Sequence, residues 1–250
     1  MKKKRLMYIG IVLSIILIVI LSNIMMREAY IRSVELQIIY PSKDKIIFEQ
    51  EIKNDLTKHF GVFTQQRRKQ IKIGEIRQYL ENKNFVEAAS VSISITGVLK
   101  IFITQRMAVV RVFDKNNKSY YLDKQGFVLK TESGKSVDVL IASGNISDTM
   151  PNKIDSIKTK QLFDIYNLSM MIYSDSILKY QIDQIARKDS SYILIPKIGS
   201  YEIVLGERKD WKQELLRLHL LYTRAFTKEG WDKYSCIDLR FSNQVICTRK

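Results

Sequence analysis

A carboxylate near a glycine is the first place in this chain to look for chemistry. In the stretch SYYLDKQGFVLK, residues 119–130, Asp123 stands three residues before Gly126 in a mostly apolar run. A catalytic carboxylate needs a second acid, base or nucleophile within reach and a cleft that raises its pKa. The sequence offers no such partner, whereas Gly126 supplies a positive φ for a tight connection in which Asp123 accepts a backbone N–H. We therefore expect Asp123 to form a turn between strands 120–123 and 126–129.

The other reactive residue types give no catalytic or metal-binding pattern. His59 and His219 are far apart, and Cys236 and Cys247 are the only cysteines, with no CxxC or HExxH motif. A metal site would need ligands that this sequence does not show. The motifs GxGxxG, GxxxxGK(S/T) and GxSxG are also missing, and no SxxK occurs with its supporting motifs. The sequence thus predicts neither an enzyme nor a cofactor.

The N-terminus predicts a membrane anchor. Four basic residues, 2–5, precede an uncharged and mostly apolar run, Leu6–Met26. As a helix, this run would span ~31 Å, enough for a hydrocarbon core of ~30 Å. A cleaved signal peptide is the alternative, but it would have a shorter apolar region and a small-x-small cleavage site, which SNIMMREAY does not offer. Because basic flanks stay in the cytoplasm, we expect a cytoplasmic tail at 1–5, a transmembrane helix at 6–26 and the remaining residues outside the cytoplasm.

The charge of the chain bears on its partners. The 250 residues are 46% apolar and 27% charged, which suits one or two folded cores, and the net charge is +15. Such a charge is typical of proteins that bind nucleic acid, but the expected topology places the body of this protein on the other side of the membrane from the chromosome. We therefore predict no nucleic-acid partner. The basic surface could meet anionic lipid headgroups, wall polymers or an acidic protein, or could simply be solvated, which is the default expectation.

Two α+β modules are expected after the anchor. The first is predicted to contain a strand at 31–40, helices at 42–61 and 75–85, and strands at 86–96 and 97–105. This order predicts two helices on one face of a three-stranded sheet. In its last strand, Leu99, Ile101 and Ile103 point one way and Phe102 the other. From residue 105 the chain becomes β-rich, with short strands and two helices.

The two helices of the second module have clear apolar faces. One covers residues 159–175, and the other begins at Asp210, a plausible N-cap. In the second helix, apolar residues step by three and four from Trp211 to Phe226, which predicts a buried stripe. A mixed or antiparallel sheet packed against these helices is the expected architecture.

The last residues predict a hairpin. If residues 242–243 of DLRFSNQVIC are a two-residue turn, Phe241 opposes Gln244 and Asp238 opposes Cys247. Cys236 is then diagonal to Cys247, so we do not expect a disulfide. In this register the N–H groups of residues 245 and 247 point away from the hairpin. We expect no further strand to cover the strand at 244–248, and an uncovered edge is a template for an incoming strand.

The order of these elements, together with four short motifs, resembles the FtsQ/DivIB family of bacterial cell-division proteins. Each motif is weak alone, but their order and spacing cover most of residues 34–248. Two departures from the family pattern occur: Ala108 stands where a proline is expected, and the usual glycine near the end of the first strand is missing. The motifs are NKNFVEAASVSIS, GVLKIFITQRMAVVRV, the hairpin residues Tyr121, Asp123, Gly126 and Val128, and a closing set of Gly230, Trp231, Lys233, Tyr234, Ile237 to Phe241 and Asn243.

The resemblance implies a POTRA domain at 27–104 and the family's β domain at 105–250. It implies a non-enzymatic role in the divisome, in which the β domain recruits bitopic coiled-coil partners of the FtsB/FtsL type and helps control septal peptidoglycan synthesis. Other divisome proteins would bind the POTRA domain. The expected location is the inner membrane at the division septum, with the N-terminus cytoplasmic and the C-terminus periplasmic. The alternative is a membrane-anchored POTRA-containing protein that assists envelope protein assembly or wall enzymes.

The resemblance also implies that the C-terminal strand region receives a partner strand. We expect the partner to lie along the outer edge of the hairpin, with residues 241 and 243 at the lip of the site. The expected partner-binding residues are Phe241, Asn243, Gln244, Val245, Ile246, Cys247 and Thr248.

Overall fold

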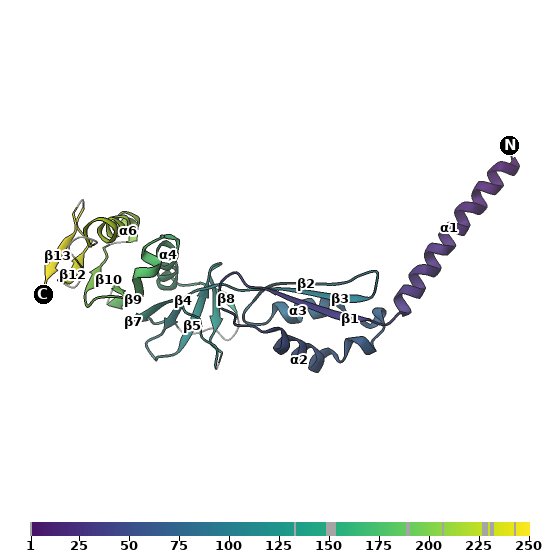
Figure 1. Cartoon of the computed structure of the whole chain (residues 1–250), viewed down its shortest axis with the longest axis horizontal. Helices are drawn as coiled ribbons and strands as arrows, with labels where there is room; N and C mark the ends of the chain where they lie inside the picture. The colour runs from purple at the N-terminus through teal and green to yellow at the C-terminus, as the bar shows by residue number, and fades with distance from the viewer. Residues whose placement is uncertain are drawn as a thin grey trace. The chain divides into compact units, whose positions relative to one another are not determined.

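The computed structural model describes residues 2–132, 134–148, 154–188, 191–206, 208–226, 230, 233–242 and 244–250 (Figure 1). The chain divides into two compact units, Met1–Gln105 and Arg106–Lys250. Each unit contains its own sheet, and within the described residues the first sheet has three strands and the second has ten. The chain is therefore an α+β protein with a sheet-rich body.

The first unit begins with a long apolar helix, α1 (Lys2–Glu28). Within the part of the chain that the structure describes, it is the one helix long and apolar enough to cross a membrane, over Gly10–Glu28. Its described apolar side chains between Ile11 and Met26 are exposed, as they would be in contact with lipid. The helix is thus compatible with the expected membrane anchor.

The body of the first unit is a three-stranded sheet in the order β1-β3-β2, with β1 parallel and β2 antiparallel to β3. The expected alternation in β3 is confirmed, because Leu99, Ile101 and Ile103 are fully buried whereas Phe102 is 39% exposed. The helices α2 and α3 bury Ile52, Leu56, Ile76 and Leu80. The elements are β1 (Ser33–Ile39), α2 (Glu49–Phe60), the short 3-10 turns η1 (Phe63–Gln65) and η2 (Arg68–Gln70), α3 (Ile73–Glu81), β2 (Val86–Ile93) and β3 (Val98–Gln105).

The predicted start of the first helix of the body is wrong. Helix α2 begins at Glu49 and not near residue 42, although it ends before Gly61 as expected. The side-chain carbonyl of Gln105 accepts hydrogen bonds from the backbone N–H groups of Ile46 (2.8 Å) and Ile47 (3.2 Å). Because Gln105 supplies the hydrogen-bond acceptor for both N–H groups, Ile46 and Ile47 can be buried in the core without being part of a helix.

The second unit is a mixed ten-stranded sheet in the order β13-β12-β11-β10-β9-β7-β4-β5-β6-β8. Three neighbouring pairs are parallel, namely β4 with β7, β7 with β9, and β11 with β12. The elements are β4 (Ala108–Phe113), β5 (Ser119–Asp123), β6 (Phe127–Lys130), β7 (Leu140–Gly144), β8 (Asp155–Ser156), α4 (Lys160–Ser174), α5 (Leu178–Gln181), β9 (Ile182–Lys188), β10 (Ser191–Pro196), β11 (Glu202–Val204), η3 (Arg208–Asp210), α6 (Trp211–Leu220), a π-helical turn at Leu221–Ala225, β12 (Tyr234–Asp238) and β13 (Ile246–Arg249).

Helices α4 and α6 pack into one hydrophobic core with the strands of this sheet (Figure 1). The predicted apolar stripe is confirmed, since Trp211 and Leu218 in α6, and Phe226 directly after the π-helical turn, are at most 4% exposed. Helix α4 is capped by Thr159, whose hydroxyl accepts from the N–H of Leu162. Asp210 is the N-cap residue of α6, as predicted, because the helix begins at Trp211, but its side chain makes no capping hydrogen bond.

Candidate functional site

Asp123 forms the predicted turn. One of its carboxylate oxygens accepts hydrogen bonds from the N–H groups of Gln125 (2.9 Å) and Phe127 (2.8 Å), and Gly126 has a φ of 81°. The other oxygen accepts from Nη1 of Arg106 at 2.8 Å, and the Arg106 guanidinium lies 4.6 Å from the centre of the Phe127 ring. Asp123 is only 1% exposed and both of its carboxylate oxygens accept hydrogen bonds. The carboxylate therefore stabilises the turn and is not accessible to a substrate.

The two histidines also have structural surroundings. His59 stacks on Tyr79, with 4.3 Å between ring centres, and His219 lies 2.9 Å from the carboxylate of Asp175. Asp175 in turn accepts from two backbone N–H groups at the start of α5. Across the described residues, no three or more histidine, cysteine, aspartate or glutamate side chains are arranged to hold a metal ion.

The strand expected to bind a partner lies at one edge of the ten-stranded sheet. Strand β13 is antiparallel to β12, with Cys247 opposite Ile237 and Ile246 opposite Asp238. The predicted register, which placed Asp238 opposite Cys247, is therefore wrong by one residue. Phe241 and Gln244 lie outside both strands and do not form the predicted pair.

Leu239 explains this register. Its side chain is fully buried, its N–H donates to the carbonyl of Val204 in β11 (3.0 Å), and its carbonyl accepts from Arg217 in α6 (2.7 Å). These three interactions direct Leu239 toward the core and β11, so the pairing of β12 with β13 ends at Asp238. Since β12 ends at Asp238 and β13 begins at Ile246, the two strands are separated by more residues than the predicted two-residue turn allows. Arg240 lies at the start of this connection, where it donates hydrogen bonds to the carboxylate of Asp238.

The outer side of β13 presents backbone amides. The N–H of Lys250 donates to the carbonyl of Lys233 across the hairpin at 3.0 Å. Because N–H directions alternate along a strand, Ile246 and Thr248 also face β12, whereas Cys247 and Arg249 face outward. The N–H of Cys247 thus points outward, as predicted. The one-residue change in register alters which β12 residue lies opposite Cys247 but not the direction of its N–H. Val245 precedes β13 and lies in the connection.

The side chains of the expected site divide between the core and the surface. Cys247 and Val245 pack partly against the hydrophobic core, whereas Phe241 is 43% and Ile246 40% exposed. Gln244 and Thr248 are also exposed, and Asn243 lies outside the described residues. The edge therefore offers outward amides next to two exposed apolar side chains.

The two cysteines are free thiols on neighbouring positions of the hairpin. Cys236 is opposite Thr248 whereas Cys247 is opposite Ile237, so their side chains point to opposite faces of the sheet. Burial is the main reason that the pKa of both thiols is raised, which keeps them in the less reactive protonated form.

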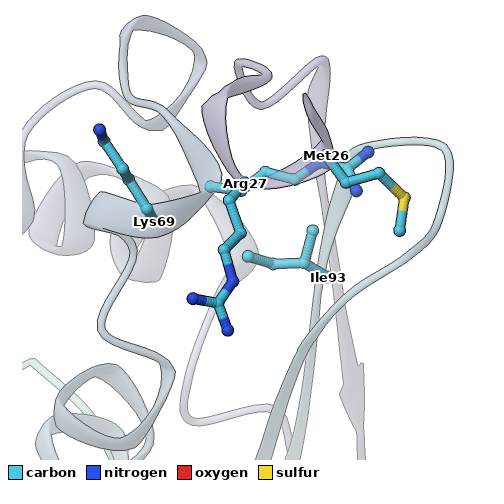
Figure 2. Close-up of a pocket in the computed structure, with 5 residues that line it drawn as sticks. Met26, Arg27, Lys69 and Ile93 are labelled. Atoms are coloured by element: carbon cyan, nitrogen blue, oxygen red, sulfur yellow. The ribbon is translucent and has the colours of Figure 1, made fainter. Parts of the chain in front are cut away.

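A second surface feature lies in the first unit, at the C-terminal end of α1. A pocket of about 370 Å³ is lined by Met26, Arg27, Arg68, Lys69 and Ile93. Figure 2 shows Met26 and Arg27 beside Ile93, with Lys69 on the neighbouring segment. The sequence analysis did not identify this pocket, and the concentration of arginine and lysine in residues 67–72 is the signal that could have indicated it.

Comparison with known proteins agrees with these motifs. Residues 107–248 match the family model described as FtsQ/DivIB, C-terminal related. The match covers more than half of the chain, so this protein belongs to the FtsQ/DivIB C-terminal related family. The chain is also similar to "Cell division protein FtsQ" of Rhodothermus marinus, with 28% identity over 169 residues that cover 65% of this chain and 60% of that protein. The chain thus matches about 60% of the length of this curated relative.

Proposed function

We propose that this protein is a non-enzymatic, single-pass membrane scaffold of the bacterial division machinery. Membership of the FtsQ/DivIB family and the name of the Rhodothermus relative support a role in cell division. The engaged carboxylate of Asp123 and the structural roles of both histidines agree with a protein that binds partners without catalysing a reaction.

The proposal includes a topology and a location. The N-terminal tail lies in the cytoplasm, α1 spans the inner membrane, and the C-terminus is periplasmic and concentrated at the septum. The basic residues before the apolar helix support this orientation. The first unit, with the order strand, helix, helix, strand, strand, is proposed to be a POTRA domain that binds other divisome proteins. The second unit is proposed to be the β domain.

The β domain is proposed to recruit an FtsB/FtsL-type partner by strand addition to β13, and thereby to help control septal peptidoglycan synthesis. The observation that carries this step is the row of outward amides at the sheet edge, with Ile246 and Phe241 exposed beside it. An added strand would gain main-chain hydrogen bonds from Cys247 and Arg249 and apolar contacts from the two side chains. Arg249 is exposed on the same strand and would favour an acidic residue in the partner.

The test removes one outward amide. Cys247→Pro deletes an N–H that β12 does not use, so the fold should be retained while partner binding is lost. Cys247→Ala is the matched control, because it changes the side chain but keeps the amide, and it should bind normally. Thr248→Pro removes an inward hydrogen bond and should lower the melting temperature. Partner pull-down and thermal melts are measured for all three full-length variants.

The outcomes separate the mechanism from a folding defect. A Cys247→Pro protein that melts like Cys247→Ala and still captures the partner would show that strand addition at β13 is wrong. Loss of binding in Cys247→Ala would instead assign recognition to the side chain. That result would also contradict the proposed mechanism.

A further inference from the structure

We propose that the end of the first unit next to α1 binds anionic phospholipids of the membrane that α1 enters, and that Ile95 inserts among their headgroups. This surface consists of residues 27–32, 66–75 and 93–98, and we call it the basal surface. The proposal rests on the proposed anchoring of α1 in the membrane, but it is independent of strand addition at β13, which concerns the other unit.

The basal surface is fastened to the end of the apolar helix. The N–H of Arg68 donates to the carbonyl of Ala29 at 2.9 Å, directly after α1 ends. Glu28, the last residue of α1, forms ion pairs with Arg67 and Lys69, both at 2.5 Å. Since Glu28 ends the helix segment suited to crossing the membrane, these contacts hold the basic residues within a few residues of the membrane surface.

The turn between β2 and β3 belongs to the same surface. Nη2 of Arg68 donates to the carbonyl of Ile95 at 2.6 Å, and the N–H of Arg32 donates to the carbonyl of Gly97 at 2.9 Å. Ile95 itself is 83% exposed. A single exposed isoleucine is ordinary on a protein surface, but here it stands at a turn tip bound to residues that adjoin a membrane helix. Its side chain is placed where an apolar group can enter the lipid interface.

Charge on the basal surface matches an anionic membrane. Its three segments contain six basic residues and two acidic residues. The two acidic residues are already paired, Glu28 with Arg67 and Lys69, and Glu75 with Lys72. Clusters of lysine and arginine next to a membrane helix attract anionic headgroups, and the attraction fades within a Debye length of the surface. The basic residues are Arg27, Arg32, Arg67, Arg68, Lys69 and Lys72.

Two hollows where the basal surface meets α1 are chemically complementary to a phospholipid. The one in Figure 2 has Arg27, Arg68 and Lys69 among its lining residues, which suits a phosphodiester. A neighbouring hollow of about 470 Å³ is mostly apolar, and it is lined by the helix residues Ile18, Leu21, Ser22, Met25, Met26 and Ala29 together with Arg68. Because Arg68 lines both hollows, a headgroup bound in one would place its acyl chains along the exposed face of α1. This continuity with the membrane helix favours a lipid over a soluble polyanion.

The experiment places a fluorescent label at residue 95 of the full chain. Cys236→Ser and Cys247→Ser remove the native thiols, and an environment-sensitive fluorophore is attached to Ile95→Cys. Asn82→Cys is the control site, because it is exposed and lies beyond the other end of β2 from the turn. Each protein is placed in phosphatidylcholine nanodiscs that contain a minor fraction of either brominated phosphatidylglycerol or brominated phosphatidylcholine. Bromine quenches the label only at close range.

We expect the label at 95 to be quenched, and more strongly by the anionic brominated lipid, while the label at 82 is not quenched. Arg27→Gln with Lys69→Gln should reduce the preference for the anionic lipid by about fivefold for each basic residue removed. Lys43→Gln with Lys45→Gln makes the same charge change near Asp44, whose carbonyl is bonded to Gln105 at the far end of the unit, and should keep the preference. An unquenched label at 95, or equal quenching by both lipids, overturns the proposal.

Discussion

Replacing Asp123 with asparagine tests the structural role assigned to this carboxylate. Asparagine keeps a side-chain oxygen that can accept from the N–H groups of Gln125 and Phe127, so the turn itself can persist. It removes the negative charge that lies 2.8 Å from the Arg106 guanidinium. Because the side chains of Arg106 and Asp123 are only 10% and 2% exposed, the arginine would remain buried without its counter-charge.

The size of the effect follows from this burial. Removing one partner of a fully buried ion pair costs about 3–5 kcal/mol. Arg106 keeps its contact with the Phe127 ring and lies 3.5 Å from the side-chain oxygen of Gln125, so part of its charge stays solvated by the protein. We therefore expect Asp123→Asn to lower the free energy of unfolding by about 2–4 kcal/mol. For a unit of this size, that corresponds to a fall in melting temperature of roughly 5–15 °C.

A double-mutant cycle is the appropriate assay. The full chain, Asp123→Asn, Arg106→Met and the double variant are unfolded by heat and by urea, and tryptophan fluorescence, to which buried Trp211 contributes, reports the second unit. Replacing both partners removes the buried charge, so the double variant should recover much of the loss seen in Asp123→Asn. If Asp123→Asn melts like the unmodified chain, or if the two single effects simply add, the ion pair does not stabilise this unit.

Three further outcomes are expected. Gly126→Val should cost about 1–2 kcal/mol of stability, because a β-branched residue resists a φ of 81°, whereas Gly126→Asn, which tolerates this region, should cost less in the same melts. Burial by itself would raise the pKa of Asp175, but hydrogen bonds from two backbone N–H groups and from His219 hold this pKa below its ordinary value of 3.8. The resulting stability is present above pH ~4 and is lost as the pH falls through the lowered pKa, so Asp175→Ala should weaken the acid dependence of the melting temperature. A reporter that is active only outside the cytoplasm should work when it is fused after Lys250, and activity confined to the cytoplasm would contradict the proposed topology.

The local pattern of the sequence was enough to predict several parts of the fold. Alternation in β3 identified Leu99, Ile101 and Ile103 as buried, and the spacing of apolar residues in α6 identified its core face. Gly126 and Asp123 indicated the turn between β5 and β6. These features depend on side-chain periodicity and on the allowed φ of glycine, which are properties of neighbouring residues. The length and apolarity of the first helix belong to the same class of signal.

Contacts between distant residues decided what the pattern could not. The side chain of Gln105 accepts a hydrogen bond from the N–H of Ile46, 59 residues earlier in the chain, and so holds Ile46 in a non-helical segment. Leu239 sets the hairpin register through its hydrogen bonds with Val204 and Arg217. The pairing of Arg106 with Asp123 likewise joins residues that no short motif links. The sequence alone determined which residues are apolar, where turns are permitted and which strand is near the end of the chain. Only the tertiary structure decided which backbone N–H groups donate hydrogen bonds within the fold and which remain at the sheet edge. A hydrogen bond to a distant strand or side chain produces no periodic pattern in the sequence from which it could be predicted.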